Sequence, residues 1–215
     1  MHDVPNPAET FDLPEDAARC AAAARSLLAH LALPGDGTAQ LLGRYAEPHR
    51  VYHDAGHVGL LWLRYLAHGG APDDRGTALA IAFHDAVHQP GARDNEARSA
   101  ALLPAWADGV AARWAASAIL ATADHLAYAG ADKRVLRLLD LDLTPLAERP
   151  ARFARNGAAL RQEEPDVPDR LWRCRQHGFL SAILARAPLF RSGLGGIYEA
   201  PARANLLAAL RDMES

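Results

Sequence analysis

Three of the ten histidines in this sequence are spaced by four residues, a spacing that suits metal binding. His49, His53 and His57 follow Pro48, and we expect one helix over residues 48–68 that carries all three on one face. Two imidazoles that project from successive turns of a helix form half of a site for a divalent cation. The spacing therefore predicts a metal-binding face on this helix.

Further candidate ligands follow later in the chain, each within an apolar stretch. His84 and Asp85 end one such stretch. A carboxylate beside histidines favours Mn, Fe, Mg or Zn over copper, and polar ligands inside apolar helices are tolerated when they are paired or metal-bound. Positions i and i+2 of a helix point about 200° apart, so only one carboxylate of an Asp-x-Asp segment should face a metal. The stretch LLDLDL contains such a segment, Asp140 and Asp142.

The alternative interpretation is that these are ordinary histidines. A lone histidine on a helix is usually a surface residue or a hydrogen-bonded core residue, and a His-Asp dipeptide is common. The ordered set favours a metal site, because a His-x₃-His pair, a His-Asp pair and a later aspartate lie on separate expected helices.

The composition predicts that these residues are positioned by an all-α fold. The chain has 47 Ala and 31 Leu against 7 Val and 4 Ile, which favours helices over strands. We expect a loose leader over residues 1–13 and a single helical domain over residues 14–215. The expected helices span 14–33, 37–46, 48–68, 75–86, 96–106, 109–124, 132–142, 150–163, 168–186 and 199–213.

Charge and composition exclude several classes of protein. The net charge of −3 argues against bulk nucleic-acid binding. No run of 18 apolar residues is present, and the acidic N-terminal stretch does not resemble a signal peptide. Cys20 and Cys174 lie far apart in the sequence and are expected to be reduced thiols. We therefore expect a cytoplasmic protein that does not bind membranes.

The order His … His-Asp … Asp on a helical scaffold resembles the HD superfamily of metal-dependent phosphohydrolases. It is most similar to a small bacterial group of predicted phosphohydrolases within that superfamily. The resemblance spans roughly residues 40–210 and implies an HD-type helical bundle. Its motifs are RYAEPHRVYHDAGHVGLL (44–61), AIAFHDAVHQPGARDNEARSA (80–100), TADH (122–125) and LLDLDL (138–143).

The resemblance implies a set of metal ligands. His57 matches the first ligand, and His84 with Asp85 matches the HD pair. Asp142 is preferred over Asp140 as the fourth ligand, because related enzymes with an Asp-x-Asp segment use the second carboxylate. One or two divalent ions (Mn, Mg, Fe, Co or Zn) would be the cofactor.

The resemblance also implies catalytic residues. The YHDAGH block is similar to the YHNxxH block of cyclic-nucleotide phosphodiesterases, whose first histidine, matching His53, protonates the leaving oxygen. His88 stands where the same enzymes have a second histidine and where some nucleotidases have a catalytic glutamate, so it is the second candidate acid. His125 would be a ligand to a second metal ion or a contact to the substrate phosphate.

Three more residues are candidates for substrate binding. Arg50, one turn before His53 on the expected helix, is placed to grip a phosphate in bidentate fashion, with a solvated helix arginine as the alternative. Glu96 and Ser99 lie one turn apart on the expected inner face of a helix, where they would contact substrate or a water molecule. That helix is expected to be capped by Asp94 or Asn95.

The leading hypothesis is a metal-dependent phosphohydrolase that cleaves a phosphate ester or anhydride of a small metabolite, with a nucleotide preferred. One alternative is a non-catalytic HD-type module that binds metal or nucleotide and signals to a partner. Another is a di-iron HD oxygenase, which needs extra histidines. A homodimer is compatible with the sequence.

Overall fold

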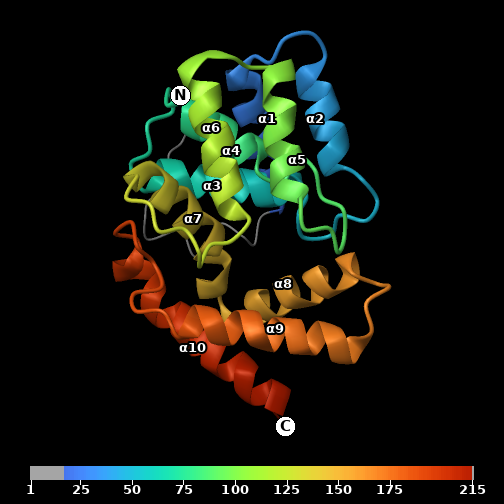
Figure 1. The fold of residues 1–215 in the computed structure, drawn as a ribbon, viewed down its shortest axis with the longest axis vertical. Coiled ribbons are helices and arrows are strands. Elements are labelled where there is room, and N and C mark those ends of the chain that lie inside the picture. Colours follow the sequence, from blue (N-terminus) through green and yellow to red (C-terminus); the bar gives the residue numbers. More distant parts are fainter. Residues whose placement is uncertain (1–16, 215) are drawn as a thin grey trace. The chain divides into compact units, whose positions relative to one another are not determined.

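The computed structural model describes residues 17–214, and every regular element in that part of the chain is helical (Figure 1). The prediction of an all-α fold is confirmed, while the expected leader lies outside the described residues. The chain groups into two compact units that divide between His125 and Leu126. The expectation of one domain over residues 14–215 stays a prediction.

The first unit is built around a helix that is buried on all sides. Every residue of α4 (Arg75–Phe83) from Gly76 to its end is buried, and α1, α3 and α6 pack against it. A helix that is apolar all round belongs in a core. The other elements of this unit are α1 (Ala17–Leu31), α2 (Gly37–Tyr45), α3 (Ala55–Ala67), α5 (Asn95–Leu102), the 3₁₀ helix η3 (Leu103–Ala105) and α6 (Gly109–Thr122).

Close contact between α1 and α3 depends on a glycine. A Cβ atom at Gly59 would lie 1.7 Å from the carbonyl oxygen of Cys20 and 3.0 Å from the backbone nitrogen of Ala24. Only glycine permits this approach of two backbones. The contact fixes α3, and with it the residues of its first turn, against α1.

The helix expected over 48–68 begins seven residues later, at Ala55. In a continuous helix the backbone N–H of His57 would donate to the carbonyl of His53. Instead it donates to the side chain of Asp54, the N-cap residue, over 3.1 Å, while the His53 carbonyl accepts from Nη1 of Arg50 over 3.0 Å. The prediction that three histidines share one helical face is therefore wrong.

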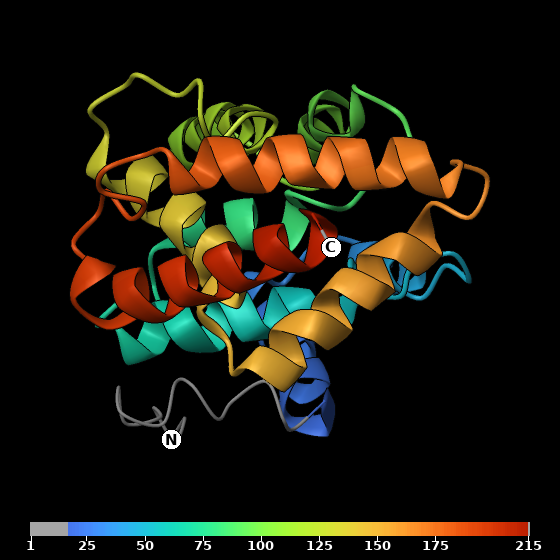
Figure 2. The same cartoon turned by 90° about the horizontal axis from the view of Figure 1, so that it is seen from below.

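The second unit is organised around a short 3₁₀ helix, η4, which contacts α7, α8 and α10. The side-chain amide of Asn205 on α10 donates to the carbonyls of Leu146 and Glu148, over 2.8 and 2.7 Å. Helix α9 packs against α10, and the two run in opposite directions (Figure 2). The elements are α7 (Lys133–Leu143), η4 (Thr144–Ala147), α8 (Pro150–Glu163), α9 (Asp169–Leu184) and α10 (Gly195–Glu214).

Three further findings bear on the sequence predictions. The last helix begins at Gly195 rather than at residue 199, so Pro201 lies inside it. Both cysteines are free thiols, Cys20 buried and Cys174 exposed. None of the helices in residues 17–214 combines the length and the hydropathy that crossing a membrane requires.

Candidate metal centre

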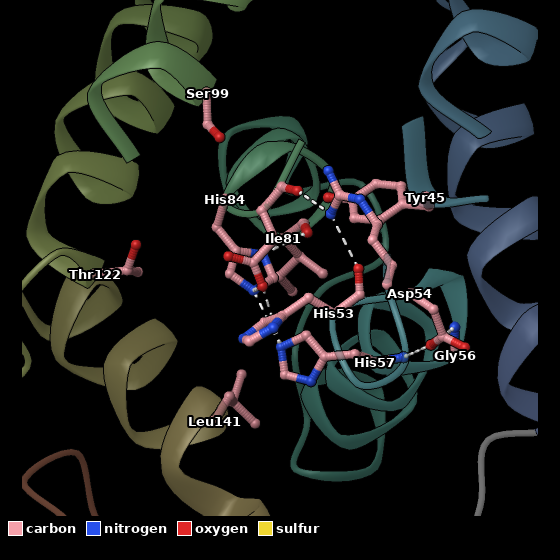
Figure 3. Close-up of polar contacts among 12 residues, drawn as sticks. Tyr45, His53, Asp54, Gly56, His57, Ile81, His84, Ser99, Thr122 and Leu141 are labelled. Carbon is pink, nitrogen blue, oxygen red and sulfur yellow. Dashed lines mark hydrogen bonds and ion pairs between the residues drawn. The ribbon is translucent and has the colours of Figure 1, made fainter. Parts of the chain in front are cut away.

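Three side chains of the first unit bring ligand atoms to one point. His57 lies in the first turn of α3, and His84 is the residue that follows α4 (Figure 3). Asp85 comes next in the sequence. Nε2 of His84 lies 3.2 Å from Nε2 of His57 and 3.0 Å from Oδ2 of Asp85. The third distance, from Nε2 of His57 to Oδ2 of Asp85, is 3.6 Å. The structure thus brings together three of the four expected metal ligands.

The spacing of these atoms suits a single cation. Atoms bonded to one ion at about 2.1 Å, at octahedral or tetrahedral angles, lie about 3.0–3.4 Å from one another. The observed separations of 3.0, 3.2 and 3.6 Å fall close to this range. A cation can therefore contact all three atoms with little movement of the side chains.

The hydrogen bonding of His84 also suits a metal ligand. Its Nδ1 lies 3.0 Å from the carbonyl oxygen of Ile81, which can only accept, so Nδ1 carries a proton. Metal-binding histidines commonly fix their second ring nitrogen in this way. The lone pair of Nε2 then faces the carboxylate of Asp85, and two acceptors 3.0 Å apart require a proton or a cation between them. Metal binding at this point would release that proton.

Burial strengthens the electrostatics of the centre. His57 and His84 are 6% and 1% exposed, and the side chain of Asp85 is 16% exposed. Burial raises the pKa of Asp85, but positive charge on His84, His53 and His57 and a hydrogen bond from His84 outweigh it, so the pKa lies well below its usual value. Asp85 is therefore an anionic ligand at neutral pH.

The two expected catalytic histidines lie together beside this centre. The rings of His53 and His88 stack with their centroids 4.3 Å apart, and the His53 ring lies 5.9 Å from that of His57. The ring of His49 stacks on that of His88 with the centroids 6.0 Å apart, and Nε2 of His49 donates to the His88 carbonyl over 2.7 Å. His49, which the sequence placed with His53 and His57 on one helical face, instead helps to hold His88.

Arg50 is buried and fully engaged with other groups of the first unit. Nη1 donates to the carbonyls of His53 and Asp85, and Nη2 donates to that of Ala86. Nε donates to the carboxylate of Glu47. The burial rules out a solvated helix arginine, and the expected grip on a phosphate would cost these bonds.

Ser99 and Asn95 support the segment that follows Asp85. Ser99 is fully buried, and its hydroxyl accepts from the N–H of Val87 over 2.9 Å and donates to its carbonyl over 3.3 Å. This bonding favours a supporting role over the expected substrate contact. Asp94 holds the N-cap position of α5 without a side-chain capping hydrogen bond, and the Asn95 side chain bonds the backbone of Gln89 instead of capping.

Glu96 lies in the first turn of α5 and is half-buried, so its expected contact with substrate stays a prediction. His125 lies in the turn after α6 and is not one of the three converging residues. Its expected role stays a prediction as well.

The two candidate aspartates of α7 belong to the second unit. Asp140 is buried and accepts from the backbone N–H of Ser192 over 2.6 Å. Burial raises its pKa, although hydrogen bonds from Arg191 and Ser192 oppose the shift. Asp142 is half-buried, and its preference over Asp140 as the fourth ligand stays a prediction.

Sequence reasoning missed the residue that starts α3, although a signal was available. Asp54 precedes a long apolar run, as an N-cap residue does, and its carboxylate accepts from the N–H groups of Gly56 and His57. The bonds of Arg50 to residues 35 and 36 positions away left no such signal.

The arrangement can perform two kinds of chemistry. Three buried or half-buried ligand atoms can hold a divalent cation, and two stacked imidazoles beside them can donate or accept a proton.

No protein-family model, curated protein or solved structure matches the chain.

Proposed function

We propose that the protein is a metal-dependent phosphohydrolase of the HD type that acts on a small phosphorylated metabolite. The observation that carries the proposal is the convergence of ligand atoms from His57, His84 and Asp85 within 3.0–3.6 Å. The sequence order of these residues, which resembles that of the HD superfamily, supports the same conclusion. A nucleotide is the preferred substrate on the strength of that resemblance alone.

His57, His84 and Asp85 would hold the cation. Two neutral imidazoles and one carboxylate suit Mn, Fe, Co or Zn, and the carboxylate also suits Mg. When bound, a divalent cation supplies charge neutralisation for a phosphoryl group and a more acidic water molecule.

His53 would supply the proton that the leaving oxygen needs. Its ring lies 5.9 Å from that of His57, and a protonated imidazole can donate to a leaving oxygen beside the metal. Stacking against His88 limits the rotation of the His53 ring, and the bond from His49 to the backbone of His88 holds the stack in turn. His88 is the second candidate for the same role.

A hydrolysis assay tests the proposal. The protein is stripped of metal with a chelator, reloaded with Mn²⁺ and offered nucleoside phosphates, cyclic nucleotides and sugar phosphates, with products separated by chromatography. We expect hydrolysis of at least one class with Mn²⁺ and none after chelation. The matched variant His84→Ala should neither bind Mn²⁺ nor hydrolyse the substrate.

Other outcomes would contradict the proposal. Tight Mn²⁺ binding without hydrolysis of any phosphate would favour the non-catalytic module. Two irons per chain by elemental analysis, again without phosphate release, would favour the di-iron oxygenase. Full metal content in His84→Ala would remove His84 from the ligand set.

A further inference from the structure

We propose that Arg50 is a positioning residue that holds the two ligand-bearing segments of the metal centre in register. The inference rests on the proposed function to the extent that these segments carry the metal ligands. It replaces the substrate contact expected from the sequence with a role inside the protein.

One guanidinium group connects both segments. Nη1 donates to the His53 carbonyl over 3.0 Å and to the Asp85 carbonyl over 2.7 Å, and Nη2 donates to the Ala86 carbonyl over 3.2 Å. The first carbonyl directly precedes the N-cap of α3, whose first turn carries His57. The other two carbonyls follow α4: one belongs to Asp85, itself a candidate ligand, and the other to Ala86, the next residue. Arg50 therefore bridges the entry to one helix and the exit from another.

The chemistry of these contacts calls for arginine. Buried backbone carbonyls outside a helix need hydrogen-bond donors from elsewhere, and those of Asp85 and Ala86 lie in the turn that follows α4. The planar guanidinium can donate to several carbonyls at once, whereas a lysine ammonium lacks the fixed fork. The centre of the Tyr45 ring lies 5.2 Å from Cζ of Arg50. The Tyr45 hydroxyl donates to the carbonyl of Ala82 on α4.

A buried positive charge beside a cation site needs compensation. Oε2 of Glu47 accepts from Nε of Arg50 over 3.0 Å, and the Arg50 side chain is fully buried. The C-terminal end of α4 adds partial negative charge from its carbonyl groups. With its charge offset in this way, Arg50 can order the backbone without opposing a bound cation.

Loss of these bonds should change the centre more than it changes the fold. They fix the backbone of Asp85 itself and of His53, so their removal shifts atoms that must stay within 3.0–3.6 Å of one another. Removing residues that orient metal ligands typically weakens metal binding by about 10- to 100-fold.

The test compares Arg50→Met with Arg75→Met. Arg75 makes the same kind of bond at the other end of α4, where Nη1 donates to the Leu31 carbonyl at the end of α1 over 2.9 Å. We expect Mn²⁺ to bind about 10- to 100-fold more weakly to Arg50→Met and within about twofold of wild type to Arg75→Met. Added methylguanidinium should restore part of the affinity in Arg50→Met and change nothing in Arg75→Met.

Hydrogen exchange of the metal-free proteins separates this inference from the proposed function. We expect faster amide exchange in residues 53–57 and 84–88 of Arg50→Met and wild-type exchange there in Arg75→Met. If the wild type binds no Mn²⁺, the proposed function fails, while faster exchange in both segments still supports the bridging role.

A folded Arg50→Met protein with wild-type exchange in both segments would overturn the inference, as would wild-type Mn²⁺ affinity where the wild type binds the metal. Should Arg50→Met fail to fold, Arg50→Lys takes its place under the same criteria, since it keeps the charge but lacks the planar fork.

Discussion

Two arginines, one in each unit, bind the end of a helix in the same way. Arg50 pairs with Glu47 and donates to carbonyls that follow α4. Arg203 pairs with Glu199 over 2.8 Å and donates to carbonyls at the end of α9. Each arginine therefore joins a carboxylate of its own segment to backbone carbonyls at or just after the end of a helix.

The surroundings of the two arginines differ in their balance of donors and acceptors. Glu199 also accepts from the backbone N–H groups of Leu189 and Phe190. Burial raises the pKa of Glu199, but these hydrogen bonds and the charge of Arg203 lower it by a larger amount, so the net shift of the pKa is downward. Beside Arg50, by contrast, two imidazole nitrogens and a carboxylate oxygen converge within 3.0–3.6 Å of one another. This group of three potential ligand atoms makes the first region a candidate binding site.

The largest effect is expected from removing the negative charge of the three potential ligands. Asp85→Asn should weaken Mn²⁺ binding by more than about 100-fold, the upper end for changes outside the ligand set, because an anionic ligand is lost. Isothermal titration calorimetry measures the affinity. Glu199→Gln is the matched change at the Arg203–Glu199 pair, which we call the balanced site, and it should bind Mn²⁺ like wild type. An affinity within tenfold of wild type for Asp85→Asn would show that this carboxylate is no ligand.

The next effect concerns proton donation. His53→Ala should lower kcat by about 100-fold, as expected for the loss of a general acid, while Mn²⁺ affinity stays within about threefold. Steady-state assays on the best substrate of the panel measure kcat. His30→Ala, at an exposed position of α1, is the control and should turn over normally. Undiminished kcat in His53→Ala would leave His88 as the acid.

The balanced site should affect stability alone. Arg203→Met removes the guanidinium that donates to the carbonyls of Leu184 and Arg186 and one of the donors to Glu199, so the free energy of unfolding should fall by about 1–3 kcal/mol. Urea denaturation followed by circular dichroism measures it. Mn²⁺ affinity should not change; a tenfold loss of affinity would mean that the two arginines do not differ as described.

The smallest effect is a pH dependence at Glu199. Because its pKa is lowered in the folded state, its ionised form stabilises the protein above the unfolded pKa of about 4.3, and this contribution is lost as the pH falls through the folded pKa. Glu199→Gln should therefore be less stable by about 1 kcal/mol at pH 7 and nearly equal to wild type in acid. Urea denaturation at several pH values measures the difference, and a constant difference across the range would contradict the assignment.

The sequence by itself determined the helical fold and the identity of three candidate ligands. Ala and Leu favour the helical backbone wherever they occur, so their excess over β-branched residues predicts helices without knowledge of the tertiary contacts. The order of His57, His84 and Asp85 likewise pointed to one centre, because residues that bind a common ion need only be of the right type and on helices that meet.

The tertiary structure decided how those ligands are held. Spacing alone put His53 and His57 on one continuous helix, but Arg50 takes the carbonyl that such a helix would use, and Asp54 takes the N–H. The same guanidinium reaches a carbonyl 35 residues away, at Asp85. A hydrogen bond between distant segments forms only once the helices have packed. It can then replace a local helical hydrogen bond that the spacing of residues in the sequence would predict.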